Sequence, residues 1–211
     1  MEIVKPYAML MTEEPDGVSW LRQLEYYGRI SWKSEDKMTD ESAPRFIKML
    51  LTKGHESVIE HVSVTVLFVV DRGVSHEIVR HRIASYTQES TRYCNYGKKG
   101  QVRVIAPPFR IPLESFEVWY EAMVHAEKAY LRLLEIGESP QIARSVLPQA
   151  TKTELVMTAN LREWRHFFTL RTADAAHPQM REVTIPLLAQ FKAAIPVIFD
   201  DIVIEDGSSP K

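Results

Sequence analysis

The stretch HVSVTVLFVV at residues 61–70 is the strongest indication of the fold. It is rich in β-branched residues and alternates between polar and apolar side chains at its start, so it predicts a strand. The preceding residues 55–61 are short and polar and predict a link or a single helical turn. Residues 40–52 predict a helix, because Pro44 falls within its first turn and Gly54 follows its end.

Beyond this strand the predicted helices and strands alternate irregularly. Residues 73–83 predict a helix, and residues 85–100 lack a helical period and predict an extended loop. Further helices are predicted over 115–136, from Pro140 to near Pro148, over 161–170 and over 180–194, and short strands over 102–106 and 153–159. Pro186 should start or kink the last helix. The regular strand–helix–strand repeat of a doubly wound sheet is absent, so we expect one α+β domain over residues 1–211, with a mixed or antiparallel sheet packed with helices.

The composition excludes several classes of protein. In 211 residues, 45% are hydrophobic and 26% are charged, which is average for globular proteins and argues against a disordered, fibrous or membrane protein. The longest uncharged run ends at Asp71, far short of the roughly 20 residues that span a bilayer. Residues 1–5 lack the pattern of a signal peptide, and the single cysteine, Cys94, cannot form an internal disulfide. We therefore expect a cytoplasmic protein.

Positive charge is concentrated in one part of the chain. The segment from Arg72 to Arg110 holds eight basic and two acidic residues, although the whole chain has a net charge of −2. This asymmetry favours a small anionic ligand over nucleic acid, because nucleic-acid-binding proteins are basic more widely. A solvated basic loop is the alternative.

The densest cluster of polar side chains is RHRIASYTQESTRY at residues 80–93. If the arginines of RHR lie at a helix end, they point to faces about 200° apart and serve two anionic ligands. In an extended loop, Ser90 and Arg92 face the same side and can bind one phosphate together. The alternative is a set of surface ion pairs, but the segment offers only Glu77 and Glu89 as partners. The chain contains no G-x-G, G-x-S-x-G or H-E-x-x-H motif, so side chains must hold any nucleotide.

The RHR motif followed by Ser90 and Arg92 resembles the signature of the flavin-dependent thymidylate synthases. Other motifs of that family follow in its order over residues 29–182. They are Arg29-Ile30-Ser31-Trp32, Gly54-His55-Glu56-Ser57 with Glu60-His61, Ala143-Arg144-Ser145-Val146-Leu147-Pro148, Asn160-Leu161-Arg162, Leu170-Arg171, and Gln179 with Arg181-Glu182.

The resemblance implies an enzyme that converts dUMP to dTMP. It implies 5,10-methylenetetrahydrofolate as the carbon donor, FAD as the cofactor and NADPH as the reductant. It also implies a homotetramer with sites at subunit interfaces, and no metal, nucleic acid or membrane as partner.

The resemblance also implies roles for individual residues. Arg171 and His55 are the expected catalytic residues, Arg171 lying against the uracil ring and His55 near the flavin and folate. The expected flavin contacts are Ser57, Arg80, His81, Arg82, Gln88, Asn160, Arg162 and His166. The expected dUMP contacts are Glu77, Arg80, Gln88, Glu89, Ser90, Thr91, Arg92, Arg144 and Arg171. Arg144 is expected to reach the phosphate from a neighbouring subunit. The mechanism implied here needs no cysteine nucleophile, so we expect Cys94 to be a packing residue.

Two other functions remain open from the sequence. One is a metal-dependent hydrolase using His55, His61, His76 and His81, although none of the neighbouring carboxylates has a standard ligand spacing. The other is a small RNA-binding module on the basic segment, whose aromatic residues are Tyr86, Tyr93 and Tyr96. A structural histidine is the alternative interpretation of His55.

Overall fold

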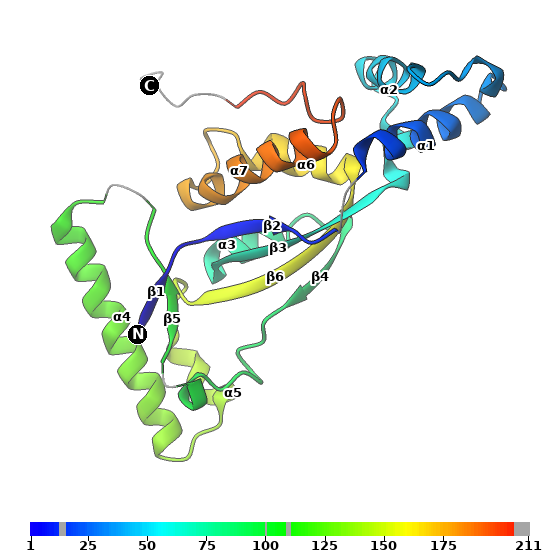
Figure 1. The fold of residues 1–211 in the computed structure, drawn as a ribbon. Helices are drawn as coiled ribbons and strands as arrows, with labels where there is room; N and C mark the ends of the chain where they lie inside the picture. Colours follow the sequence, from blue (N-terminus) through cyan, green and yellow to red (C-terminus); the bar gives the residue numbers. More distant parts are fainter. Residues whose placement is uncertain (13–15, 100, 109–110, 205–211) are drawn as a thin grey trace. The chain divides into compact units, whose positions relative to one another are not determined.

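A computed structural model of the chain describes residues 1–12, 16–99, 101–108 and 111–204 (Figure 1). They form two compact units, each drawn from separate stretches of the chain. Unit 1 comprises Met1–Tyr7, Phe68–Arg80 and Tyr86–Val156, and unit 2 comprises Ala8–Leu67, His81–Ser85 and Met157–Lys211. Gly100 and Arg110, which end the predicted loop and the basic segment, lie outside the described residues. The expectation of one domain over residues 1–211 stays a prediction.

The strands form two sheets. β1 (Glu2–Val4) and β5 (Arg103–Ile105) pair in parallel, with Glu2 opposite Arg103. The four-stranded sheet has the order β2-β3-β6-β4, and its strands are β2 (Tyr7–Leu10), β3 (Ser63–Asp71), β6 (Lys152–Asn160) and β4 (Ala84–Gln88). An antiparallel bridge joins Val104 to Thr151. Both directions of pairing therefore occur, and the predicted α+β class with a mixed sheet is confirmed.

Unit 1 is built around a small apolar core. Its helices are α3 (Arg72–Ile78), α4 (Leu113–Glu135) and α5 (Pro140–Ala143), with the 3-10 turns η3 (Tyr96–Lys99) and η4 (Arg144–Val146). Side chains of α4 and β5 meet there, among them Tyr130, which is fully buried, and Val104. Cys94 packs against the same cluster, which agrees with the packing role expected for it.

Unit 2 contains two pairs of helices. The first pair is α1 (Gly17–Ile30) and α2 (Ser42–Thr52), with the 3-10 turns η1 (Glu35–Lys37) and η2 (Glu56–His61). The second pair is α6 (Leu161–Arg171) and α7 (Pro178–Ala194), which lie side by side in Figure 1. Trp164, Phe168 and Phe191 are fully buried between elements of this unit. The Trp164 indole donates a 3.0 Å hydrogen bond to the Val64 carbonyl, which fixes α6 to β3.

Three sequence-based expectations need correction. α3 ends at Ile78 instead of continuing to Ile83, so the RHR motif follows the helix and does not lie in it. Residues 84–88 form a strand, whereas an extended loop was expected over 85–100, because they join the sheet beside β6. Just after this strand, the Glu89 N–H bonds to the Glu154 carbonyl. Pro186 lies inside α7 and therefore does not start the helix, while the predicted kink stays a prediction.

Other predictions hold and some elements were not predicted. The helices near 42–52, 113–135 and 161–171 and the strands near 63–71 and 152–160 agree with the sequence patterns. α1, β1 and β2 were not among the expected elements. None of the helices in the described ranges combines the length and apolar character that crossing a lipid bilayer requires.

Candidate functional site

The predicted phosphate-binding residues lie on a turn in unit 1. Residues 91–93 form this turn just after β4, and the Ser90 carbonyl accepts the N–H of Cys94 at 2.9 Å. The Ser90 hydroxyl accepts the backbone N–H of Arg92 at 3.2 Å. The extended conformation expected here is therefore wrong, because local hydrogen bonds close the segment into a turn.

Two arginines reach this turn. Arg144, at the start of η4, donates a 3.3 Å hydrogen bond from its guanidinium to the Thr91 hydroxyl. The exposed Arg92 donates from Nε to Gln141 of α5 at 3.2 Å. All of these groups belong to one chain, and the expectation that Arg144 reaches the phosphate from a neighbouring subunit stays a prediction. The arrangement places two guanidinium groups next to two hydroxyls, a donor set that suits a phosphate dianion.

Partly buried polar contacts hold the start of the turn in place. Gln88 donates to the hydroxyls of Ser75 at 2.9 Å and Thr153 at 3.2 Å. Glu89 accepts the Tyr96 hydroxyl at 3.1 Å and the Lys152 ammonium at 3.0 Å. Since these partners already engage both side chains, Gln88 and Glu89 serve as anchors of the turn, and their predicted ligand contacts stay predictions.

The sequence reasoning missed Lys152 and Tyr96 as parts of this site. The Lys152 side chain is only 3% exposed and also pairs with Glu154. Burial and the adjacent Glu89 hold the pKa of Tyr96 well above its usual range, so its hydroxyl stays protonated as a donor. Lys152 stands one residue before the strand predicted over 153–159, so the sequence pattern gave no signal of its burial. Of the other predicted residues of unit 1, Glu77 is half-buried on α3 and Arg80 is exposed.

In unit 2, α6 brings three predicted residues together. The imidazole of His81 is buried, and its Nδ1 lies 2.9 Å from Glu163 Oε1. Arg171 donates from Nε to His81 Nε2 at 3.1 Å. The ring of His166 lies 5.4 Å from that of His81. Burial lowers the pKa of His81, and Arg171 and His166 lower it further, although Glu163 acts in the opposite direction.

This cluster has some features of a metal site. One ligand atom from each of His81, Glu163 and His166 lies within 4.8 Å of the others. However, Arg171 occupies Nε2 of His81 and brings a positive charge, which disfavours a divalent cation. The hydrolase alternative would require His55 and His61 as ligands. The three-ligand group found among the described residues includes neither of them.

A cavity of about 610 Å³ lies at the start of α6. Three of its lining residues, Asn160, Arg162 and His166, are predicted flavin contacts. Asn160 caps α6, since its side chain accepts the Glu163 N–H at 2.9 Å. Arg162 is about half exposed and pairs with Glu60 at 2.6 Å.

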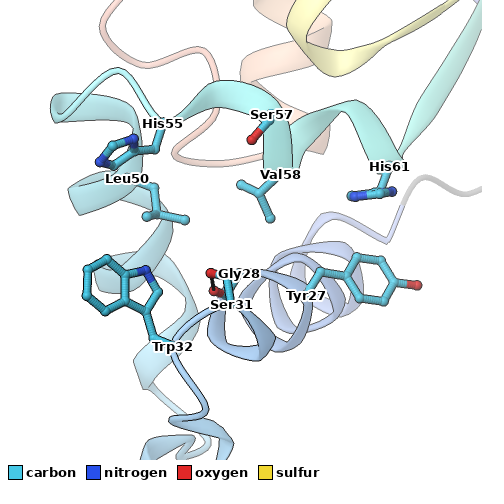
Figure 2. A pocket seen from close by; sticks show the side chains of 9 residues that line it. All are labelled: Tyr27, Gly28, Ser31, Trp32, Leu50, His55, Ser57, Val58 and His61. Atoms are coloured by element: carbon cyan, nitrogen blue, oxygen red, sulfur yellow. Dashed lines mark hydrogen bonds between the residues drawn. The ribbon is translucent and has the colours of Figure 1, made fainter.

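A second cavity, of about 290 Å³, lies between α1 and η2 (Figure 2). Ser57 of η2 and His55, the residue before η2, line one side of it, and Trp32 and Gly28 line it from the α1 side. A Cβ atom on Gly28 would lie 2.8 Å from the Phe46 ring, so glycine lets α1 and α2 approach closely. The cavity thus gathers residues from two of the family motifs, at 29–32 and 54–61.

Gly54 has a left-handed backbone conformation, which places His55 at this cavity. Gly54 has a φ of +72° and follows the end of α2. The His55 N–H bonds to the Leu50 carbonyl and the Gly54 N–H to the Leu51 carbonyl, both at 2.9 Å, which is a Schellman motif. His55 and Ser57 are both exposed, as a ligand contact requires, and Arg82 in the same unit is exposed too.

Comparisons with known proteins give a consistent result. Residues 19–197 match the family described as thymidylate synthase complementing protein. A flavin-dependent thymidylate synthase of Pyrococcus furiosus is 34% identical over 185 residues, which covers 85% of this chain and 75% of the relative. The Geobacter sulfurreducens enzyme of the same name is 35% identical over 167 residues, covering 79% and 72%. The crystal structure of the UMP/dUMP methylase PolB from Streptomyces cacaoi, bound with 5-Br dUMP, is similar with a TM-score of 0.78 and 25% identity, covering 95% and 96% of the two chains.

Proposed function

Because the chain belongs to the thymidylate synthase complementing protein family, we propose that it methylates dUMP to dTMP. FAD is the cofactor in this proposal, as the relatives' name, flavin-dependent thymidylate synthase, implies. We further propose 5,10-methylenetetrahydrofolate as the carbon donor and NADPH as the reductant.

The observation that carries the proposal is the polar turn of unit 1. Arg144 bonds to Thr91 beside the exposed Arg92, and Ser90 lies at the start of the same turn. Arginine binds a phosphate through two parallel hydrogen bonds, so two guanidinium groups and neighbouring hydroxyls suit the 5′-phosphate of a nucleotide. Three of these residues, Ser90, Arg92 and Arg144, are also positions at which the sequence matches the family motifs.

The residues of unit 2 fit a flavin. The cavity at the start of α6 has a volume within the usual range of cofactor sites. Arg162, with its half-exposed guanidinium at this cavity, would hold an anionic part of the cofactor by exchanging its contact with Glu60. Asn160 and His166 would add polar contacts from the same helix. When bound, FAD supplies the reducing equivalents of the reaction.

In this proposal Arg171 takes part in the reaction and Cys94 does not. Arg171 is a half-buried cation that would lie against the uracil ring and stabilise negative charge as N3 loses its proton. Cys94 packs against the apolar core of unit 1, and a hydride-based reaction gives it no nucleophilic role.

The proposed assembly is a cytoplasmic homotetramer with sites at subunit interfaces, and with no metal, nucleic acid or membrane partner. Exposed apolar side chains on α4 support further burial by other copies of the chain: Val118 is 66% exposed and Tyr120 is 44% exposed.

The aromatic residues weigh against the RNA-binding alternative. Tyr96 is buried and bonded to Glu89, and the Tyr86 hydroxyl donates to the Ile78 carbonyl at 3.0 Å. Tyr93 is exposed, but it packs under the guanidinium of Arg92 at 5.2 Å. These three rings therefore do not form the open stacking platform that single-stranded RNA requires.

The test is direct. The purified protein should be yellow, should contain FAD, and should oxidise NADPH faster when dUMP is present. It should form dTMP when 5,10-methylenetetrahydrofolate is added. A colourless protein that cannot be reconstituted with FAD would contradict the proposal, and a stoichiometric metal content would favour the hydrolase instead.

A further inference from the structure

We propose that Glu163 and His81 are positioning residues that hold the guanidinium of Arg171 in its working orientation. The proposal rests on the function proposed above for the role of Arg171. Glu163 matches none of the family motifs in the sequence and had no assigned role. The structure links it to Arg171 through the imidazole of His81.

The link consists of two hydrogen bonds in series. Glu163 Oε1 lies 2.9 Å from His81 Nδ1, and Arg171 Nε donates to His81 Nε2 at 3.1 Å. The Glu163 side chain is 9% exposed and that of His81 is 3% exposed, so little water competes for these contacts. Phe167 packs edge-on against the imidazole at 4.9 Å and limits its rotation.

The chemistry of the three groups determines where the protons lie. A guanidinium has only donors, so Nε2 of His81 must be its unprotonated acceptor. The ring proton therefore lies on Nδ1 and is donated to the Glu163 carboxylate. In this tautomer a carboxylate orients an imidazole, and the imidazole in turn orients a cation.

The position of Glu163 in α6 would ordinarily give its carboxylate a different hydrogen-bond partner. Asn160 caps α6, and Glu163 stands three residues later, where a glutamate ordinarily reaches back to the N–H of the capping residue. Its carboxylate bonds to His81 instead. This contact joins residues 82 positions apart, which indicates that the carboxylate serves the imidazole and its partner Arg171.

The arrangement also makes the orientation of Arg171 depend on pH. Three titratable side chains of α6 act on His81: Glu163 raises its pKa, whereas Arg171 and His166 lower it. Protonation of His81 places a proton on Nε2, removes the acceptor and sets two positive charges against each other. Arg171 should then leave its position, so activity should fall on the acidic side as His81 becomes protonated.

The test compares Glu163→Ala with Glu163→Gln. Loss of the carboxylate in Glu163→Ala should lower kcat for dTMP formation about tenfold, with the FAD content unchanged. The amide oxygen of Glu163→Gln still accepts the Nδ1 proton, so this variant should recover most of the activity. Glu163→Gln lacks the negative charge that raises the pKa of His81. In a plot of activity against pH, the fall on the acidic side (the acidic limb) should therefore lie at lower pH for this variant than for the parent. Glu135→Gln, on the exposed surface of α4, is the matched control and should change neither kcat nor the pH of the acidic limb.

A second measurement is independent of catalysis. Nitrogen NMR of the histidine-labelled protein reports the tautomer of each imidazole, and the signal of His81 is identified with His81→Gln. The parent should show His81 with its proton on Nδ1. A proton on Nε2, or a Glu163→Gln variant whose acidic limb does not move, would overturn the proposal. A parent protein with the expected tautomer that forms no dTMP would instead contradict the proposed function and leave the hydrogen-bond series intact.

Discussion

Arg144 and Thr91 are 53 positions apart in the sequence, yet the guanidinium of Arg144 donates a 3.3 Å hydrogen bond to the hydroxyl of Thr91. The contact joins η4 to the turn that follows β4 within one chain. It brings the A-R-x-x-L-P motif and the segment after RHR, which are separate in the sequence, to the surface that we propose binds the phosphate.

This surface leads to the first prediction. Arg144→Ala or Arg92→Ala should weaken dUMP binding about tenfold to a hundredfold, since each removes a charged donor to the phosphate. Binding of deoxyuridine, which has no phosphate, should not change. Isothermal titration of both ligands measures the difference, with Arg132→Ala on the surface of α4 as the control. An equal loss for both ligands would show that these arginines do not bind the phosphate.

The second prediction separates the roles of two arginines in unit 2. Arg171→Lys keeps the charge but loses the planar fork, so dTMP formation should fall by ~10²-fold or more while the FAD content stays near normal. Arg82→Ala should lose flavin first and activity as a consequence. FAD absorbance and dTMP yield are measured side by side. If Arg171→Lys loses its flavin while Arg82→Ala keeps flavin and activity, this division of roles is wrong.

The third prediction concerns the single cysteine. Cys94 packs against the core of unit 1, and the proposed reaction has no thiolate nucleophile. Cys94→Ala should therefore keep turnover within a few-fold of the parent, as measured by dTMP formation. A loss on the order of a thousandfold in a folded, flavin-containing variant would mean that the reaction uses the thiol.

The fourth prediction concerns stability. Lys152 is buried beside Glu89, so Lys152→Met leaves a mostly buried carboxylate without its cation. We expect a loss of about 3–5 kcal/mol in the free energy of unfolding, measured by urea denaturation. Arg132→Met breaks the exposed pair with Glu135 and should cost less than about 1 kcal/mol. Similar losses in the two variants would contradict a structural role for the buried pair.

The fifth prediction follows from the lowered pKa of His81. The unfolded chain protonates this histidine near pH 6.5, whereas the folded chain does so only at lower pH. Between these two pKa values the unfolded state binds more protons, so the free energy of unfolding should fall as pH falls. Urea unfolding at several pH values should show a steeper acid decline for the parent than for His81→Gln. Parallel declines would show that folding does not lower the pKa of His81.

The sequence alone determined the features that depend on neighbouring residues. Apolar spacing predicts α2, α4 and α6, because a helix repeats its contacts every three or four residues. The β-branched run at 61–70 predicts β3, and the helix predicted from Pro140 begins there as α5. The motifs from Arg29 to Glu182 also identified the family, because the type and order of residues are properties of the sequence itself.

Only the tertiary structure decided which residues meet across long distances in the chain. Residues 84–88 form β4 because they pair with β6. The sequence of residues 84–88 alone does not indicate that partner. The same holds for Arg144 with Thr91 and for Glu163 with His81. The spacing of Asn160 and Glu163 predicts a local capping contact, but burial of His81 beside α6 directs the carboxylate to the imidazole. A buried polar group needs a partner, and only the fold determines which group is within reach.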